Sequence, residues 1–488
     1  MESNESATDR RGPTRRTVLV SGAAAALGLP LLRAPQAVAA GGVPADGPGD
    51  ALRRADGPGG PLRPQQPDRE LKALLREMDP ARIEASIARL VAFGTRNTLS
   101  SQDDPVRGIG AARDWIFAEM QRSAATSRGR MTVAKQAFTQ TAGLPTPTVI
   151  TNVVTTLRGT ATPERVYVVT GHYDSRITDV FDAVGDAPGA DDDASGVAAV
   201  LELVRVFATR PTEATIIFAA VAAEEQGTFG SAFLAAQLKA AGTDIQGMVS
   251  NDIIGASSAH DGTRPDPRTV RLFVEGVPTS ETAQQAAIRQ AVGGEDDGPS
   301  RQLARFVQNV AQNSDTGMTI RIIWRRDRFL RGSDHIPFLQ QGYPAGRLTE
   351  PRENFDHEHQ DVRVEDGVQF GDLIEFVDFD YTTRVARVNA AMLWSLAQGP
   401  GTPKGVIIVA VALTNQTTVH WTRGTEPDLA GYEVLWRETT APDWTHVIPV
   451  GDVSSVTIDL VKDNVHFGVR AVDRDGHRSP VAYPRPGS

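Results

Sequence analysis

The sequence predicts an α/β domain with a mostly parallel central sheet flanked by helices, followed by a small all-β sandwich. Two observations carry this prediction. From about residue 149, short apolar runs alternate with segments whose apolar residues recur at helical spacing, which is typical of a parallel sheet. Beyond residue 404 the helical spacing disappears and short alternating strands dominate, which is typical of a sandwich.

Helices are expected before the first strand. Apolar residues recur at helical spacing over residues 71–78 and again over 83–91. Asp79-Pro80 separates these two segments, because the residue before a proline disfavours helical geometry. A third helix is expected over residues 108–123.

Strands and helices then alternate along the chain. Strands are expected over residues 149–157, 165–171, 214–222 and 247–254, and helices over 195–208 and 231–241. Residues 258–300 are rich in Gly, Asp, Pro and Ser and predict a long surface excursion. Closing helices are expected over 373–396. Ligands of such domains collect beyond the carboxyl ends of the strands.

A second domain is predicted after the dense Gly and Pro punctuation at residues 399–403. Short strands are expected there over residues 418–421, 431–436, 455–460 and 466–472. The expected organisation is therefore an α/β domain over residues 69–399 and a sandwich over residues 404–488.

The N-terminus predicts export. Arg15-Arg16 precedes a short, mildly apolar run, and the small residues 37–39 follow it, as in a twin-arginine signal over residues 1–40. A disordered basic tail is the alternative. Residues 41–68 are dense in Gly, Pro and Asp and predict a flexible linker. No other stretch approaches the roughly 20 apolar residues of a membrane span, so a periplasmic or extracellular protein without a span is expected.

Bulk composition excludes several classes of function. The chain has 488 residues and a net charge of −10, and it lacks a basic stripe with interleaved aromatics, so no nucleic-acid partner is expected. It contains no cysteine, which excludes disulfides, thiolate ligands and a cysteine nucleophile. Any bound metal must be held by His, Asp and Glu.

Three clusters of chemical groups follow predicted strands or precede a predicted helix. His172 ends one strand, with Asp174 two residues on, an arrangement that suits a metal ligand and an orienting carboxylate but also a structural pair. Residues 191–193 are three consecutive aspartates before a helix; one helix cap explains one of them, and a cation would relieve the repulsion among the rest. Glu224 and Glu225 follow an apolar strand, where one can ligate and the other can move a proton.

Two further clusters complete the pattern. Asp252 lies near the end of the strand expected over 247–254, and alone it is no more than a cap. Residues 355–361 contain His357 and His359, and residues 332–338 contain Asp334 and His335, whose imidazole is as consistent with a structural role as with a ligand. This concentration of histidine in a cysteine-free chain indicates a nitrogen- and oxygen-based metal site, with enough carboxylates for two divalent ions.

The order and spacing of these motifs closely resemble those of the co-catalytic zinc aminopeptidases of metallopeptidase clan MH, the leucyl aminopeptidase and aminopeptidase Y type. The resemblance covers residues 71–398. It implies a zinc exopeptidase fold and two zinc ions. His172 and Asp252 would bind one zinc and Glu225 and a late histidine the other. Asp191 would be the bridging carboxylate, with the family's cis peptide at Asp191-Asp192.

The resemblance implies further roles. Glu224 would be the general base, Asp174 would orient His172, and Asp334 would support the late ligand. The family spacing to Asp361 selects His357 as that ligand, with His359 as the alternative. The family's upstream tyrosine and its disulfide have no counterpart here. The C-terminal segment resembles a fibronectin type III module, which would bind a surface or another protein.

The implied function is hydrolysis of peptide bonds at the free N-terminus of a peptide or protein. Two alternatives on the same fold stay open. A carboxypeptidase would need an arginine for the substrate carboxylate, for which Arg331, Arg347 and Arg352 are available, and a glutaminyl-cyclase-like enzyme would use one zinc. A third alternative is a non-enzymatic secreted binding protein with a relict metal site.

Overall fold

A computed structural model describes residues 57–259, 263–294 and 297–488. The predicted export signal and the first part of the predicted linker lie outside these residues. Within them, no helix combines the length and the apolar character needed to cross a bilayer.

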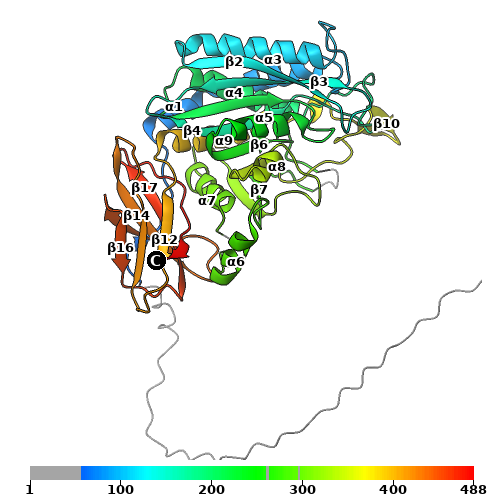
Figure 1. Ribbon diagram of the computed structural model, residues 1–488. Coiled ribbons are helices and arrows are strands. Elements are labelled where there is room, and N and C mark those ends of the chain that lie inside the picture. The colour runs from blue at the N-terminus through cyan, green and yellow to red at the C-terminus, as the bar shows by residue number, and fades with distance from the viewer. Residues whose placement is uncertain (1–56, 260–262, 295–296) are drawn as a thin grey trace, which may run out of the picture. The chain divides into compact units, whose positions relative to one another are not determined.

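The centre of the α/β part is an eight-stranded sheet with the order β2-β3-β5-β4-β6-β9-β7-β8 (Figure 1). The inner strands β5, β4, β6 and β9 run parallel, while β2–β3, β3–β5 and β7–β9 pair antiparallel. The strands are β2 (Met131–Gln140), β3 (Thr148–Leu157), β4 (Thr162–His172), β5 (Ala214–Val221), β6 (Asp244–Asn251), β7 (Thr269–Val274), β8 (Thr319–Trp324) and β9 (Ala345–Thr349).

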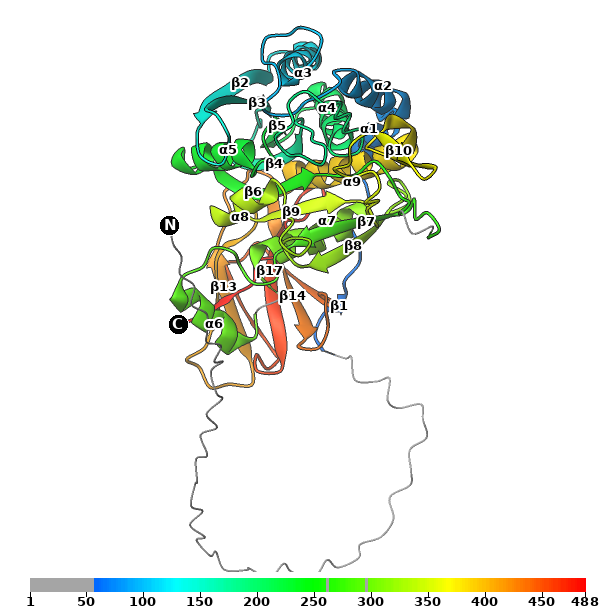
Figure 2. The ribbon, with the colours of Figure 1, turned by 90° about the vertical axis from the view of Figure 1, so that its right-hand side faces the viewer.

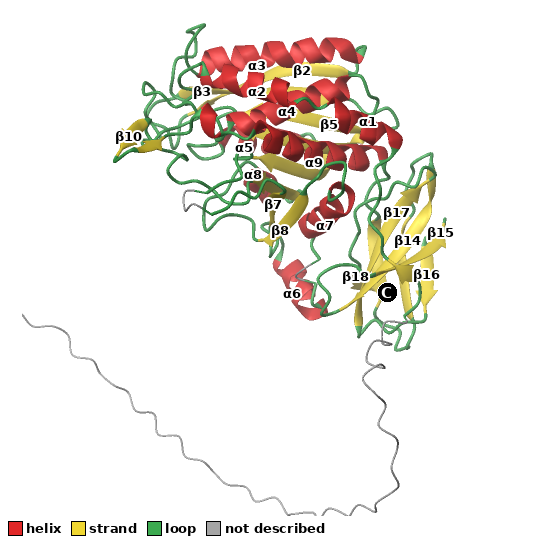
Figure 3. Ribbon diagram, turned by 180° about the vertical axis from the view of Figure 1, so that it is seen from behind, coloured by secondary structure: helices red, strands yellow, loops and turns green. Residues whose placement is uncertain are grey.

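Helices cover both faces of this sheet, which confirms the predicted fold class. Figure 3 shows α1, α2, α4 and α9 in front of the strands. The helices are α1 (Arg69–Glu77), α2 (Pro80–Val91), α3 (Ile109–Ala124), α4 (Ala194–Ala208), α5 (Phe229–Ala240), α6 (Ala283–Val292), α7 (Pro299–Ala311), α8 (His335–Gln340) and α9 (Phe379–Gln398), with short 3-10 turns at Ala125–Ser127 and Ile374–Phe376. A hairpin of β10 (Arg363–Glu365) and β11 (Val368–Phe370) lies apart from the sheet.

The alternation of side chains along β4 and β5 explains the two layers of helices. Tyr167 and Phe218 point into a core shared with α1–α4, α7 and α9. Val168 and Ile217, one residue away on each strand, point into a second core shared with α5 and α8. Both faces of the inner strands are therefore apolar, as expected for a buried parallel sheet.

Local signals set the helix boundaries. Asp68 caps α1 by accepting the backbone N–H of Leu71, and Asp79 caps α2, with Pro80 at its first turn. Asp193 caps α4 through the N–H of Gly196. The helices and strands predicted between residues 71 and 254 correspond to observed elements, although the sequence analysis missed β2.

One expectation between the strands is wrong. Residues 258–300 are not only a surface excursion, because β7 lies among them and pairs with β8 and β9. Val270 and Leu272 of β7 are buried, which the surrounding Gly, Pro and Asp residues concealed.

The C-terminal strands form two four-stranded sheets together with β1 (Gly60–Pro61), with the orders β1-β15-β14-β17 and β16-β13-β12-β18. Trp421, Tyr432, Trp436 and Phe467 lie in their shared core. The strands are β12 (Lys404–Val409), β13 (Thr417–Thr422), β14 (Leu429–Glu438), β15 (His446–Gly451), β16 (Ser455–Ile458), β17 (Val465–Asp473) and β18 (Arg485–Gly487).

The described end of the predicted linker is not a free segment. β1 (Gly60–Pro61) pairs with β15 and lies beside the sandwich strands in Figure 2. The indole N–H of Trp436 donates to the carbonyl of Pro58, at 2.8 Å, and the N–H of Leu62 donates to Thr445. In these described residues, glycine allows close packing and proline lies in an edge strand. The prediction of a flexible linker was therefore wrong for this part of the segment.

We expect residues 57–63 to stabilise the sandwich. A chain that begins at Pro64 should have a free energy of unfolding about 2–4 kcal/mol lower than a chain that begins at Gly57, because the hydrogen bonds to Trp436 and Thr445 and the cover over the indole are lost. Urea denaturation followed by near-UV circular dichroism measures this difference. Arg63→Ala, at an exposed position, is the control and should change it by less than about 0.5 kcal/mol. Equal stabilities of the two truncated chains would contradict the expectation.

Candidate metal centre

The candidate residues lie where three parallel strands end. His172 is the last residue of β4, Glu224 and Glu225 follow β5, and Asp252 follows β6. Residues 191–193 immediately precede α4. The carboxyl ends of parallel strands meet at one edge of a sheet, so residues distant in sequence come together there.

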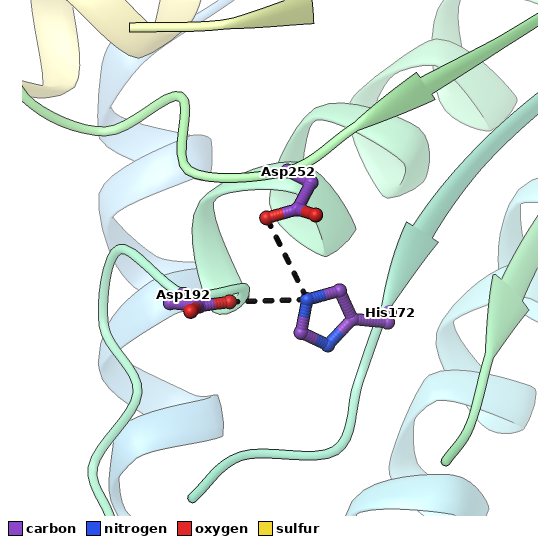
Figure 4. A group of neighbouring side chains, drawn as sticks. All are labelled: His172, Asp192 and Asp252. Carbon is purple, nitrogen blue, oxygen red and sulfur yellow. Dashed lines mark ion pairs between the residues drawn. The ribbon is translucent and has the colours of Figure 1, made fainter. Parts of the chain in front are cut away.

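His172, Asp192 and Asp252 form the first group (Figure 4). His172 is fully buried, and its Nε2 lies 3.0 Å from Asp192 Oδ1 and 3.8 Å from Asp252 Oδ1. Its Nδ1 lies 3.1 Å from the backbone oxygen of Asp174, which fixes the plane of the ring. Nε2 is thereby aimed at the two carboxylates.

Asp192 also belongs to the second group. Its Oδ2 lies 2.9 Å from His359 Nε2, and Glu225 Oε2 lies 3.3 Å from the same nitrogen. One carboxylate oxygen of Glu358 also lies within 4.8 Å of ligand atoms of Asp192 and His359. Asp192 therefore directs one oxygen to each histidine, which is the arrangement expected of a carboxylate shared by two cations.

Buried atoms without partners test whether cations fit these groups. His172 Nε2, Asp192 Oδ1 and Glu225 Oε1 are buried, and none makes a hydrogen bond within the described residues. His172 Nε2 and Asp192 Oδ1 face each other only as an ion pair at 3.0 Å. A buried polar atom without a partner is costly, and divalent cations bound at the two groups would satisfy these atoms. Imidazole nitrogens and carboxylate oxygens are ligands that zinc accepts.

Electrostatics leads to the same conclusion. Burial raises the pKa of Glu225, and it raises that of Glu224 well above its usual value. Burial opposes protonation of His359, but Glu225 and Asp192 outweigh it and raise the histidine pKa to about 11. Ionised carboxylates are therefore costly at this site, and positive charge there would stabilise them.

Asp174 and Asp193 shape the backbone around the site. The carboxylate of Asp174 accepts the N–H groups of Glu224 at 3.2 Å and Glu225 at 3.1 Å. Asp193 accepts the N–H groups of His172 and Gly196, each at 2.9 Å. Asp174 was predicted to orient His172 through its carboxylate; its backbone oxygen is the closer partner, and its carboxylate holds the glutamate turn.

The structure does not bring Asp191, the predicted bridging residue, into either group. Asp191 Oδ1 accepts the N–H of Gly255 at 2.6 Å, and the side chain faces Glu350. The cis peptide joins Asp192 to Asp193 rather than Asp191 to Asp192. The expectation was therefore one residue too early. Three identical residues in a row offer no internal mark of register, and only the fold distinguishes them.

The late histidine also differs from the prediction. The His357 ring stacks on Phe376 with ring centroids 3.7 Å apart, away from both groups, whereas His359 reaches Asp192. His359 has a left-handed backbone, with φ of 57°. A count along the sequence to Asp361 does not reveal this backbone conformation, so it did not show which ring faces the site.

Asp334 and His335 lie outside both groups. Asp334 is buried, both of its oxygens lack hydrogen-bond partners among the described residues, and burial raises its pKa to about 7. His335 begins α8, and its Nε2 lies 2.5 Å from the backbone oxygen of Arg326. The structural interpretation of His335 fits this contact.

Sequence reasoning missed two residues that hold the acidic loop. The carboxylate of Asp372 accepts the N–H of Asp191, at 2.9 and 3.0 Å to its two oxygens, and the N–H of Asp192 at 2.8 Å. The guanidinium of Arg96 is fully buried and donates to the carbonyls of Tyr173, Leu90, Pro188 and Gly189. No neighbouring sequence motif predicts either role. A buried arginine must bind several acceptors, but the sequence does not show that Arg96 is buried.

Comparison with known proteins gives consistent matches. The family model for peptidase family M28 matches residues 152–365. A protein of Leptosphaeria maculans named as a probable zinc metalloprotease is 54% identical over 430 residues, covering 88% of this chain and 99% of that protein. A probable zinc metalloprotease of Pyrenophora tritici-repentis is 52% identical over 87% of this chain and 89% of its own length.

Solved structures are more distant. The Legionella pneumophila LapA aminopeptidase is 17% identical, covers 66% of this chain and 73% of its own, and has a TM-score of 0.46. The Porphyromonas gingivalis glutaminyl cyclase is 17% identical over 65% of this chain and 98% of its own, with a TM-score of 0.44. Likenesses at this level do not distinguish one activity from another.

We expect Asp372 to support cation binding without contacting the cation. Asp372→Ala should remove the acceptor for the Asp191 and Asp192 N–H groups and weaken metal affinity about 10- to 100-fold. Metal retained after dialysis against graded chelator, read by elemental analysis, measures this change. Glu375→Ala, at an exposed position nearby, is the matched control. Equal retention in both variants would show that Asp372 does not hold the loop.

Proposed function

The chain belongs to peptidase family M28 and is a zinc-dependent peptidase, and we propose that it releases amino acids from the free N-terminus of peptides or proteins. One observation carries the proposal that two ions take part. Asp192 lies between two groups of buried ligand atoms, and each group contains an atom that no described residue satisfies.

The proposed ligands follow from these distances. His172 and Asp252 would hold one zinc, Glu225 and His359 would hold the other, and Asp192 would contribute to both. Zinc, when bound, would acidify a water molecule and polarise the scissile carbonyl. Burial raises the pKa of Asp252, but Arg347, which donates to Asp252 Oδ1 at 2.9 Å, and His172 together outweigh burial and keep this pKa below its usual range. Asp252 therefore stays ionised for ligation.

Glu224 is the proposed general base. Its backbone is fixed by Asp174, its side chain makes no ion pair or hydrogen bond with the described residues, and burial raises its pKa well above the usual value. A carboxylate with a raised pKa accepts a proton more readily. It would take the proton of the attacking water and pass it to the amine nitrogen as the peptide C–N bond breaks.

The arginines considered for a carboxypeptidase support the aminopeptidase proposal. Arg347 is buried and donates to Asp252, and Arg331 pairs with Glu353 and Glu358. Neither offers a free guanidinium to a substrate carboxylate. Arg352 is exposed and is therefore the arginine that a carboxypeptidase could use to bind the substrate carboxylate. A one-zinc cyclase would leave one of the two groups without a function.

Export by the twin-arginine route and a binding role for the C-terminal sandwich remain parts of the proposal. The first rests on Arg15-Arg16 and the apolar run after it. The second rests on the sandwich architecture and on its distance in sequence from the residues of the metal centre. Neither is needed for the chemistry of the site.

The bridging role of Asp192 has a direct test. Asp192→Asn should lose most of the bound zinc, because it removes the charge that both groups share, whereas Asp191→Asn should keep it. Elemental analysis after gel filtration gives the zinc content of each variant. His359→Gln and His357→Gln form a second matched pair, with loss expected only in the former. The reverse pattern in either pair would restore the assignment to Asp191 or His357.

The activity itself is tested with peptides that have free or acetylated N-termini. The zinc-loaded protein should shorten only the free peptides, from the N-terminus, as read by mass spectrometry. Glu224→Gln should lower kcat by about 10²–10⁴-fold while retaining zinc. Shortening of acetylated peptides from the C-terminus would replace the aminopeptidase with a carboxypeptidase. A rate for Glu224→Gln near that of the unaltered protein would remove Glu224 from the mechanism.

A further inference from the structure

Glu358 is a buried carboxylate that the proposed mechanism does not use. It precedes His359 in the chain, and its exposed fraction is 8%. One of its oxygens lies within 4.8 Å of ligand atoms of both Asp192 and His359. A charged side chain is rarely buried to this extent unless it is paired or has a function.

Two arginines fix one side of this carboxylate. Arg331 donates to Glu358 Oε1 at 2.9 Å, and Arg328 lies 3.8 Å from the same oxygen. Both arginines also pair with Glu353, so they belong to a network that is held independently of Glu358. The side chain of Glu358 is therefore held in one position, which is a requirement for a selective binding group.

The other oxygen is free. Glu358 Oε2 is buried and has no hydrogen-bond partner within the described residues. Arg331 donates to Oε1 and Arg328 lies near the same oxygen, so Oε2 is left without a donor on a carboxylate that lies beside Asp192 and His359. A buried acceptor without a hydrogen bond costs free energy, so a bound ligand that donates to it gains affinity.

We propose that Glu358 receives the positively charged ammonium group of the substrate. This inference rests on the proposed function and adds a residue that recognises the substrate. A carboxylate and an ammonium group form short charge-assisted hydrogen bonds, and removal from water strengthens them. In an N-terminal residue the α-ammonium and the scissile carbonyl are joined through one carbon, so a group beside the metal centre is well placed to receive it.

An ammonium group can come from two sources, the α-amino group or the side chain of a basic residue. Two pairs of hydroxamate inhibitors distinguish them. Leucine hydroxamate and 4-methylpentanohydroxamate differ only in the α-amino group. Lysine hydroxamate and norleucine hydroxamate share that group and differ in the side-chain ammonium. The ratio of inhibition constants within each pair reports how strongly the protein recognises that ammonium.

The test compares these ratios in the zinc-loaded protein and in Glu358→Gln. The glutamine keeps an oxygen for Arg331 but loses the charge. The advantage of the amino group in the leucine pair should fall by about 10- to 100-fold in Glu358→Gln. A fall confined to the lysine pair would support the same chemistry with the side chain as its source. Glu365→Gln, an exposed glutamate on the β10–β11 hairpin, is the control and should change neither ratio.

Several results would overturn the inference. Unchanged ratios in Glu358→Gln would remove Glu358 from substrate recognition. Loss of zinc from this variant would make Glu358 a metal ligand instead. If the variant does not fold, the unaltered protein still provides a test. Equal inhibition constants within both pairs would show that the protein recognises neither ammonium group, which would overturn the inference. These inhibitor measurements do not require turnover, so they separate a failure here from a failure of the proposed peptidase activity.

Discussion

Repulsion among buried carboxylates is the constraint around which this site is built. Asp192, Asp193 and Asp252 are all buried at the same edge of the sheet, with the glutamate turn beside them. Each carboxylate must find positive charge or donors, or the edge would not fold. Backbone N–H groups satisfy Asp174, Asp193 and Asp372, and Arg347 satisfies Asp252. Asp192 and Glu225 keep oxygens that nothing in the described chain satisfies.

This distribution separates supporting carboxylates from the proposed ligands. The supporting groups accept backbone N–H groups, which hold the loops. The proposed ligands Asp192 and Glu225 lie beside histidine nitrogens and keep buried oxygens without a hydrogen bond. The same residue type therefore has two functions, and its hydrogen-bond partners determine which one it performs.

Much of this arrangement could be predicted from the sequence, and the failures have physical causes. The apolar periods of β4, β5 and β6 located the strands, and the residues that follow them located the site. Register within Asp191–Asp193 was not recoverable, because identical neighbours carry no mark of orientation. His357 and His359 were confused because the backbone of His359 is left-handed, which a count along the sequence does not reveal. Asp372 and Arg96 bind backbone atoms that are mostly far away in the sequence. Since every residue has a backbone, no sequence pattern identifies these partners.

The segment between His359 and Asp372 has a further consequence. His359 reaches the side chain of Asp192, and Asp372 holds the backbone of the same residue, so both ends of this segment are tied to one point. The β10–β11 hairpin between them pairs only with itself among the described strands (Figure 1). Loop length has a small entropic cost when the ends are fixed. The hairpin is therefore a place where relatives can differ in length and sequence, and where a designed insertion can be accommodated, without displacing the proposed metal ligands.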